Sequence, residues 1–100
     1  MNRRTKALAI TPRVKAAVFE RDGGVCIFCN RPGLPEAHYI PRSQGGLGIK
    51  ENIITVCREC HDLLDNSTQR RGMLRYVRRY LNAIYPDFPD KKRRYDKYAE

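Results

Sequence analysis

Two Cys-x-x-Cys pairs constrain the fold of this chain more than any other feature. Cys26 and Cys29 form the first pair, and Cys57 and Cys60 form the second. A two-residue spacer lets both sulfurs of a pair point toward one ion, and two such pairs supply the four thiolates of a tetrahedral zinc site. Two disulfides or four unrelated thiols are the other interpretations. We favour structural zinc, because the spacing is typical of it and cysteines stay reduced inside cells.

The small size of the chain is a second reason to expect a structural metal. A chain of 100 residues is expected to form one domain, and a domain of this size buries only a modest core. This one has no tryptophan and three phenylalanines. Structural zinc contributes roughly 10–16 kcal/mol to small domains, whereas the stability of a whole domain is about 5–15 kcal/mol. Loss of the ion is therefore expected to unfold much of the protein.

The charge of the chain predicts a polyanionic partner. Its 20 Lys and Arg residues against 11 Asp and Glu give a formal net charge of +9 and a pI near 9.8. Nucleic acid is the first candidate. An acidic membrane surface ranks lower, because the basic residues do not accompany a run of large apolar ones. The N-terminus lacks the apolar centre of a signal peptide, and no stretch is apolar enough to span a bilayer, so we expect an intracellular protein.

The first half of the chain predicts a helix followed by a β-hairpin. The helix is expected to begin at Pro12, with Thr11 as its N-cap, and to end at Gly23. Two short strand-like segments follow, at 37–41 and 53–57, with a glycine-rich loop between them. Two strands around such a loop predict an antiparallel hairpin.

The second half of the chain predicts helices. One is expected over 57–68 and a longer one over 69–86, followed by a last short helix in the tail. The longer helix has an apolar stripe made of Met73 or Leu74, Val77, Leu81 and Ile84. The fold class is therefore α+β in one domain, with a loose basic arm, a zinc-containing core and basic C-terminal helices, over 1–10, 11–66 and 69–100 respectively.

Four polar residues outside the cysteine pairs suggest a second site. His38 lies on the first predicted strand, Asn52 precedes the second, and His61 follows the last cysteine. Asp65 shares a helical face with His61, and a histidine with a carboxylate can hold a divalent cation. With His38 as a base for water, these are the parts of a phosphodiesterase site. Taken alone, Asn52 is a common turn residue, and His61 could instead bind a backbone group near the zinc.

The segments EAHYIPRSQGG (36–46) and ENIITVCRECH (51–61), together with RDGGVCIFC (21–29), resemble an HNH nuclease of the small zinc-containing kind found in bacteria and phages. The resemblance runs from Thr11 through Asp65. It implies a ββα-metal (His-Me finger) core that cuts double-stranded DNA with Mg²⁺ or Mn²⁺. It also implies the cytoplasm of a bacterium or phage-infected cell, and a partner in phage packaging or restriction.

The resemblance also implies a role for each site residue. His38 would be the general base, Asn52 would brace the loop and so orient His38, and His61 would bind the catalytic cation. Asp65 stands where many relatives carry a further ligand. One position departs from the pattern, because the residue before the base is usually an Asp or His ligand and here is Ala37.

Three outcomes of this departure stay open. Glu36 lies on the same strand face as His38 and is one substitute ligand. Alternatively, His61, Asp65, water and the DNA phosphate hold the cation. The third outcome is weak or absent catalysis, which makes the chain a zinc-dependent DNA-binding or assembly module. A nucleic-acid chaperone or RNA binder is a weaker alternative, which would bind avidly without metal-dependent cleavage.

Arginines are the expected DNA contacts. Arg42 follows the first strand and is either a phosphate ligand or a solvated loop residue. A helix face carries the others, and no acidic residue interrupts the chain between 70 and 85. Such a face is often only solvated, but its uniformly positive charge favours phosphate contact. These helical residues are Arg70, Arg71, Arg75, Arg78 and Arg79.

Overall fold

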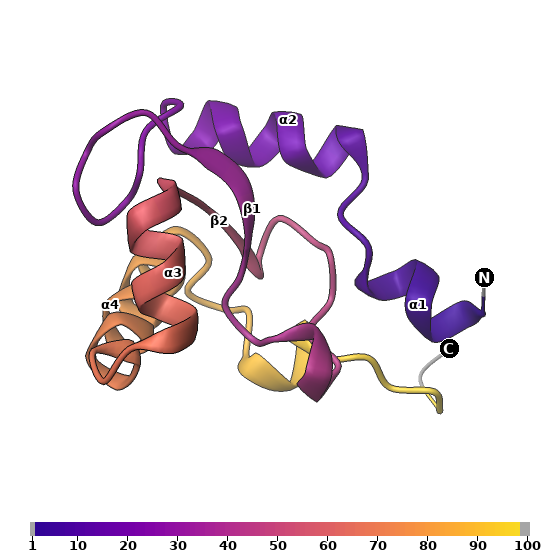
Figure 1. The fold of residues 1–100 in the computed structure, drawn as a ribbon. Coiled ribbons are helices and arrows are strands. Elements are labelled where there is room, and N and C mark those ends of the chain that lie inside the picture. The colour runs from indigo at the N-terminus through magenta and orange to yellow at the C-terminus, as the bar shows by residue number, and fades with distance from the viewer. Residues whose placement is uncertain (1, 99–100) are drawn as a thin grey trace.

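The structure is a computed structural model that describes residues 2–98, and it confirms the α+β class (Figure 1). Its elements are, in order, α1 (Arg3–Leu8), α2 (Pro12–Arg21), β1 (Leu34–His38), the 3-10 turn η1 (Arg42–Gln44), β2 (Ile53–Val56), α3 (Arg58–Asn66), α4 (Arg70–Ile84) and the 3-10 turn η2 (Asp90–Arg93). β1 and β2 form an antiparallel two-stranded sheet, and α3 follows β2 directly. This is a ββα unit with flanking helices. None of the helices within 2–98 is both long and apolar enough to cross a membrane.

The β-hairpin was expected, but its first strand begins earlier than the sequence indicated. β1 covers 34–38 rather than 37–41, and Ala37 pairs with Ile54 while His38 pairs with Ile53. The strand also ends earlier than predicted, at His38, because the N–H of Ile40 binds the side chain of Asn52 and not a strand partner. The second strand is buried at all four positions and matches its prediction closely.

The two faces of β1 have different surroundings. Pro35 and Ala37 are buried, whereas Glu36 is exposed and His38 is half-buried. Ala37 is only 1% exposed and belongs to the hydrophobic core. Because side chains alternate along a strand, Glu36 and His38 share the other face, as expected.

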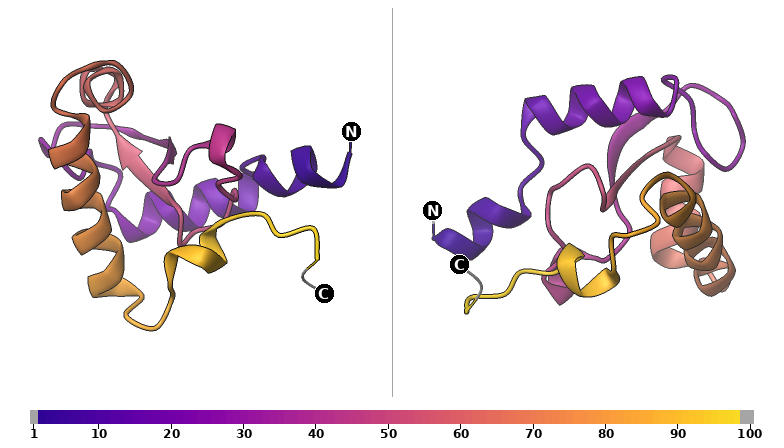
Figure 2. Two further views of the ribbon diagram at one scale, coloured as in Figure 1. Left: turned by 90° about the horizontal axis from the view of Figure 1, so that it is seen from below. Right: turned by 180° about the vertical axis from the view of Figure 1, so that it is seen from behind.

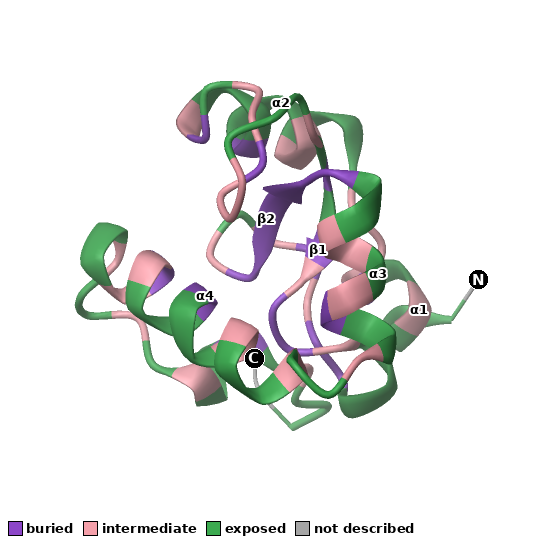
Figure 3. Cartoon of the chain, turned by 60° about the vertical axis from the view of Figure 1, so that its left-hand side comes forward, coloured by how far each residue is buried: buried purple, intermediate pink, exposed green. Residues whose placement is uncertain are grey.

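The core lies between the sheet and helices α3 and α4, and Figure 3 shows the buried β2 beside the partly buried stripe of α4. Val77 and Leu81 of α4 are fully buried, and Met73 and Leu74 pack against the core. The predicted stripe is therefore right except at its end, because Ile84 in the last turn is 39% exposed.

Helix α2 begins as its sequence predicts. The Thr11 hydroxyl accepts the N–H of Val14 at 3.2 Å, and Pro12 occupies the first turn. Val18 is fully buried. This cap and anchor fix the direction in which the chain approaches the first cysteine pair.

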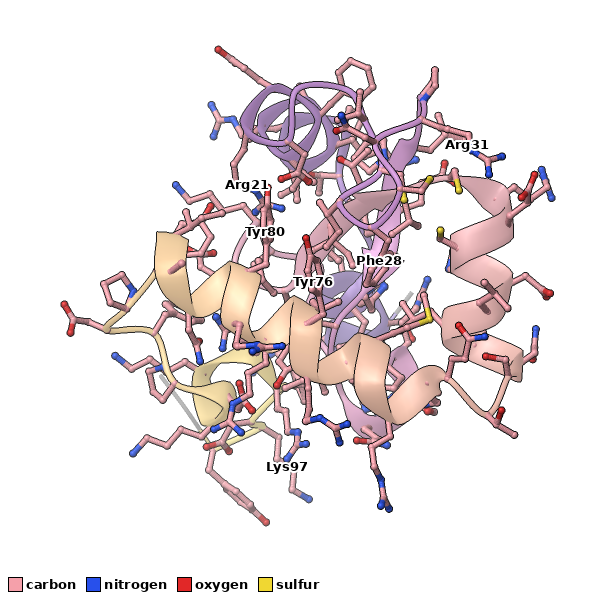
Figure 4. All side chains as sticks on the ribbon, turned by 90° about the vertical axis from the view of Figure 1, so that its left-hand side faces the viewer. Arg21, Phe28, Arg31, Tyr76, Tyr80 and Lys97 are labelled. Carbon is pink, nitrogen blue, oxygen red and sulfur yellow. The ribbon has the colours of Figure 1, made fainter. Side chains whose placement is uncertain are left out.

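A buried polar network at the end of α2 was not anticipated. Arg21 and Asp22 form an ion pair at 2.8 Å, and the other Asp22 oxygen accepts the N–H of Thr55 at 2.9 Å. The Tyr80 hydroxyl donates a hydrogen bond to Asp22, and Figure 4 shows Arg21 and Tyr80 pointing toward each other. Burial acts to raise the pKa of Asp22, but these bonds, led by that from Arg21, hold it below its usual value. The network joins α2 to β2 and α4.

The N-terminal ten residues were expected to be a loose arm, and this prediction is wrong. Residues 3–8 form a helix, because the Asn2 side chain accepts the N–H of Thr5 at 2.8 Å and so caps its first turn. Leu8 is 2% exposed. The carbonyl of Ala7 accepts the N–H of Gly48 at 3.0 Å, which attaches the segment to the loop of the hairpin.

The C-terminal tail forms a 3-10 turn instead of the expected last helix. Its Arg93 is fully buried, lies over the rings of Tyr39 and Phe88, and donates to Asp90 at 2.8 Å. The N–H of Tyr95 also donates to the glycine-rich loop at 2.7 Å. The tail thus passes close to α4, where Arg93 donates to Asn82 at 3.5 Å, and its end lies on the same side of the molecule as α1 (Figure 2).

Candidate functional site

The four cysteine sulfurs come together as predicted. They all lie within 4.8 Å of one another, and Cys57 also caps α3, its sulfur accepting the N–H of Cys60 at 3.4 Å. The Sγ atoms of Cys29 and Cys57 are 3.6 Å apart. Four converging thiols suit a tetrahedral structural metal such as zinc. A metal held here would join the first cysteine pair to the start of α3.

Backbone N–H groups favour the thiolate of Cys26, whereas the neighbouring sulfurs raise the pKa of Cys29, and burial with those sulfurs raises that of Cys60. Burial acts to raise the pKa of the Cys26 thiol, but N–H groups of Cys57, Cys29 and Phe28 outweigh it and lower that pKa to about 7. A thiolate is therefore accessible near neutral pH, and thiolate is the form that binds metal. Beside the cluster, the ring of Phe28 packs against that of Tyr76 on α4 (Figure 4), with centroids 5.4 Å apart.

An acidic groove of about 690 Å³ lies between the hairpin and α3. Within it, His61 Nε2 lies 3.3 Å from Asp65 Oδ2, the pairing expected from their shared helical face. Glu36 lines the same groove from β1. The other lining residues are Leu34, Val56, Arg58, Glu59, Asp62 and Asn66. Carboxylates around one imidazole are a donor set that fits a divalent cation such as Mg²⁺ or Mn²⁺.

The ligand atoms of His61, Asp65 and Glu36 do not converge on one point. Within residues 2–98, the cysteine cluster is the sole group of three or more His, Cys, Asp or Glu residues whose ligand atoms meet closely. Glu36 instead lies 3.8 Å from Lys15 of α2. The arrangement is therefore a two-residue pair, His61 and Asp65, with Glu36 across the same groove.

His38 is held so that one ring nitrogen is free. Its Nε2 lies 3.0 Å from the carbonyl oxygen of Leu8. A carbonyl can only accept, so Nε2 carries the proton of the neutral ring and Nδ1 has the lone pair. Burial lowers the pKa of His38 below its ordinary value, and the charges of Arg42 and His61 also lower it. The hydrogen bond to the Leu8 carbonyl acts to raise this pKa but does not outweigh them. His38 is therefore neutral at neutral pH, as a general base must be.

Asn52 is placed as a brace and does not reach solvent. It is fully buried, and its side-chain oxygen accepts the N–H of Ile40 at 2.9 Å. Its amide group donates to the carbonyls of Ile40 and Leu47, at 3.2 and 2.9 Å. It thus ties the chain just after His38 to the far side of the loop.

Replacing Asn52 with Ala should lower the free energy of unfolding by about 2–6 kcal/mol, because the buried N–H and carbonyl of Ile40 both lose their partner and each such loss costs about 1–3 kcal/mol. Urea denaturation of the metal-loaded protein measures this change. The matched control is Asn66→Ala, whose exposed amide donates to the side chain of Asp62; there we expect a change within about 0.5 kcal/mol. Equal stability of the two variants would contradict the bracing role.

The loop that Asn52 braces carries Arg42 into solvent. Arg42 is exposed at the start of η1, and its charge acts on His38. Gly46 permits the tight return of this loop, because a Cβ there would lie 1.6 Å from the carbonyl oxygen of Ile40. Arg42 is therefore exposed and close enough for its charge to act on His38.

The arginines of α4 divide into two kinds. Arg70 donates to the carbonyl of Leu64 at 2.8 Å and lies 4.0 Å from Asp65, so it joins α4 to α3. The other four are exposed, namely Arg71, Arg75, Arg78 and Arg79. A groove of about 530 Å³ next to Tyr39 is lined by three of them, Arg71, Arg75 and Arg78, and by Arg70.

Comparison with known proteins finds a similar family for about half of this chain. Residues 26–73 match the sequence profile described as HNH endonuclease, a segment that includes both cysteine pairs, the hairpin, α3 and the start of α4. Over this segment the chain resembles HNH endonucleases. The resemblance drawn from the sequence is thus confirmed, and it supports a nuclease role for this domain.

A curated relative agrees with this assignment. The type IV methyl-directed restriction enzyme EcoKMcrA of Escherichia coli (strain K12) is 26% identical over 94 aligned residues, which cover 84% of this chain. The alignment covers 34% of the relative. The chain therefore spans about a third of that enzyme's length.

Proposed function

We propose that this HNH domain is a metal-dependent DNA endonuclease in which His38 is the general base and one divalent cation binds at His61 and Asp65. The observation that carries the proposal is the half-buried His38, neutral and with a free Nδ1, at the end of the strand that also lines the acidic groove. A base and a cation site on one ββα unit are what phosphodiester hydrolysis needs.

In the proposed reaction, Nδ1 of His38 takes a proton from the water that attacks the scissile phosphate. The Nε2–H bond to Leu8 keeps the imidazole in the tautomer that can accept this proton, and Asn52 holds the backbone that follows it. A cation at His61 and Asp65 would stabilise negative charge on the phosphate and the leaving oxygen. Glu36 is the proposed third ligand, reached by leaving its ion pair with Lys15.

Affinity for double-stranded DNA is proposed to come from backbone contacts, made by Arg42 and the exposed arginines of α4. The charge of Arg42 acts on His38, and the groove along α4 lies next to Tyr39, which directly follows His38. Such contacts are independent of sequence and are weakened by salt. A restriction-like role, or one in phage packaging, would place the domain beside a protein partner.

Removing two of these arginines should flatten the salt dependence of DNA binding. For Arg75→Gln with Arg78→Gln, the slope of log K against log salt should fall by about 1.8, which is about 0.9 for each phosphate that the protein no longer neutralises. Fluorescence anisotropy with a DNA duplex, titrated over a range of salt, measures the slope. The control is the double variant Arg13→Gln with Lys50→Gln, which removes the same charge from exposed positions outside α4. Equal slopes for the two double variants would argue against α4 as the DNA-binding helix.

One alternative has a specific observation in its favour. Because the candidate cation ligands do not converge on one point within residues 2–98, the domain could be a zinc-dependent DNA-binding or assembly module without catalysis. Supercoiled plasmid incubated with the zinc-loaded protein separates the two functions. The nuclease predicts nicked or linear plasmid with Mg²⁺ or Mn²⁺ and none with EDTA. A gel shift with intact plasmid under every condition would favour the binding module.

A further inference from the structure

We propose that the N-terminal segment, residues 2–9, is a positioning element of the active site: the Leu8 carbonyl keeps the proton of neutral His38 on Nε2 and so frees Nδ1. The proposal rests on His38 acting as the base. It assigns a task to a segment that lies outside the region matched to the HNH family.

The contact satisfies two polar groups at once. Leu8 is the last residue of α1, and the final carbonyls of a helix have no partner within that helix. The His38 ring supplies the missing donor at 3.0 Å, across 30 positions of sequence. The base and the end of α1 therefore depend on each other's position.

Other contacts hold α1 against the segment that follows β1. The Ala7 carbonyl accepts the N–H of Gly48 at 3.0 Å, and a guanidinium nitrogen of Arg4 lies 3.4 Å from the Arg42 carbonyl. The approach is close at Gly48, where a Cβ would lie 2.1 Å from the Ala9 carbonyl oxygen. Together with buried Leu8, these contacts set where the Leu8 carbonyl lies.

Helix α1 depends on its contacts with the loop to keep its position and its helical form. A helix of six residues is too short to be stable by itself, since isolated helices below about 12–15 residues are marginal in water. It persists here through its contacts with the loop. A change that displaces α1 should therefore release the His38 ring and leave the cysteine cluster and the ββα core in place.

Gly48→Ala is the direct test, because its added methyl group would collide with the backbone at Ala9. Gly72→Ala on α4 is the matched control, where the nearest atom to a Cβ is the end of the Arg75 side chain at 3.8 Å. Nitrogen-15 NMR of the zinc-loaded protein should show a His38 Nε2–H proton protected from exchange in the wild type and in Gly72→Ala. In Gly48→Ala this protected signal should be lost. The half-exposed His61, the other histidine of the chain, is an internal reference.

Variants that lose the protected His38 signal should also cleave DNA more slowly. Gly48→Ala is expected to reduce the single-turnover rate by about 10²-fold, the cost of misplacing a catalytic group by about 1 Å, with DNA affinity unchanged. Leu8→Ser, which removes the apolar anchor without crowding the loop, should act in the same direction. Zinc content shows whether the core of each variant is folded.

Two results would overturn the proposal: a protected His38 Nε2–H in both α1-displacing variants, or its loss with a wild-type cleavage rate. If the wild-type protein does not cleave DNA under any condition, the proposed function fails. The NMR comparison then decides by itself whether α1 sets the tautomer of His38.

Discussion

His38→Ala is expected to reduce the single-turnover rate of DNA cleavage by about 10²–10⁴-fold, the usual contribution of a general base. The reason is that His38 presents a free Nδ1 and is neutral at neutral pH, whereas alanine cannot accept a proton. Quantifying nicked plasmid against time, with protein in excess over DNA, measures the rate.

The fold should survive this substitution, so the loss can be assigned to chemistry. The His38 ring is half-buried, and water can take its place at the Leu8 carbonyl. Zinc content and DNA affinity are therefore expected to stay at wild-type values. The control variant Ser43→Ala changes an exposed position on the same loop and should cleave at the wild-type rate. A His38→Ala protein that cuts at the wild-type rate would exclude His38 as the base.

Removing the structural metal should unfold most of the domain. Structural zinc contributes roughly 10–16 kcal/mol in small domains, which is comparable with or larger than the total stability of about 5–15 kcal/mol. Here the cysteines join the turn after α2 to the start of α3, next to the buried β2. Circular dichroism during chelator titration should show loss of helix in parallel with zinc release, and Cys57→Ser should give a similar unfolded state.

This experiment also separates zinc from disulfides. A reductant without chelator should leave the domain folded if the four sulfurs bind metal, and should unfold it if they form two disulfides. Adding zinc back to the chelated protein should restore the helix signal. A domain that stays folded after complete removal of metal would contradict the structural role of the cluster.

The parts of the fold that could be predicted are those specified by short sequence patterns. The cysteine spacing predicted the cluster, Thr11 and Pro12 predicted the start of α2, and the β-branched run predicted β2. Each depends on residues close together in sequence. The pairing of His61 with Asp65 was predictable for the same reason, since they are four residues apart on one helix.

The parts that could not be predicted depend on contacts between distant segments. In the sequence Arg93 is one more basic residue of a charged tail, yet it is fully buried between aromatic rings. Asp22 stands in a turn before two glycines, yet it joins α2 to β2 and α4. The docking of α1 depends on Gly48, and no local pattern in the N-terminal residues indicates that partner.

Ala37 shows how a structure can change an interpretation. The sequence resemblance implied a metal ligand at this position, which suggested a missing donor. Its side chain is 1% exposed in the hydrophobic core, and that of Glu36 lines the acidic groove. A carboxylate in place of Ala37 would therefore enter the core in this backbone geometry. The question of a third ligand moves to Glu36.

The most direct test of the proposed mechanism is the single-turnover cleavage rate as a function of Mn²⁺ concentration, for the wild type, His61→Ala and His38→Ala. If His61 binds the cation and His38 is the base, His61→Ala should need more Mn²⁺ for half-maximal cleavage. His38→Ala should keep the wild-type Mn²⁺ dependence with a much lower maximal rate. Identical Mn²⁺ curves for the wild type and His61→Ala, or no cleavage by the wild type at any Mn²⁺ concentration, would contradict it.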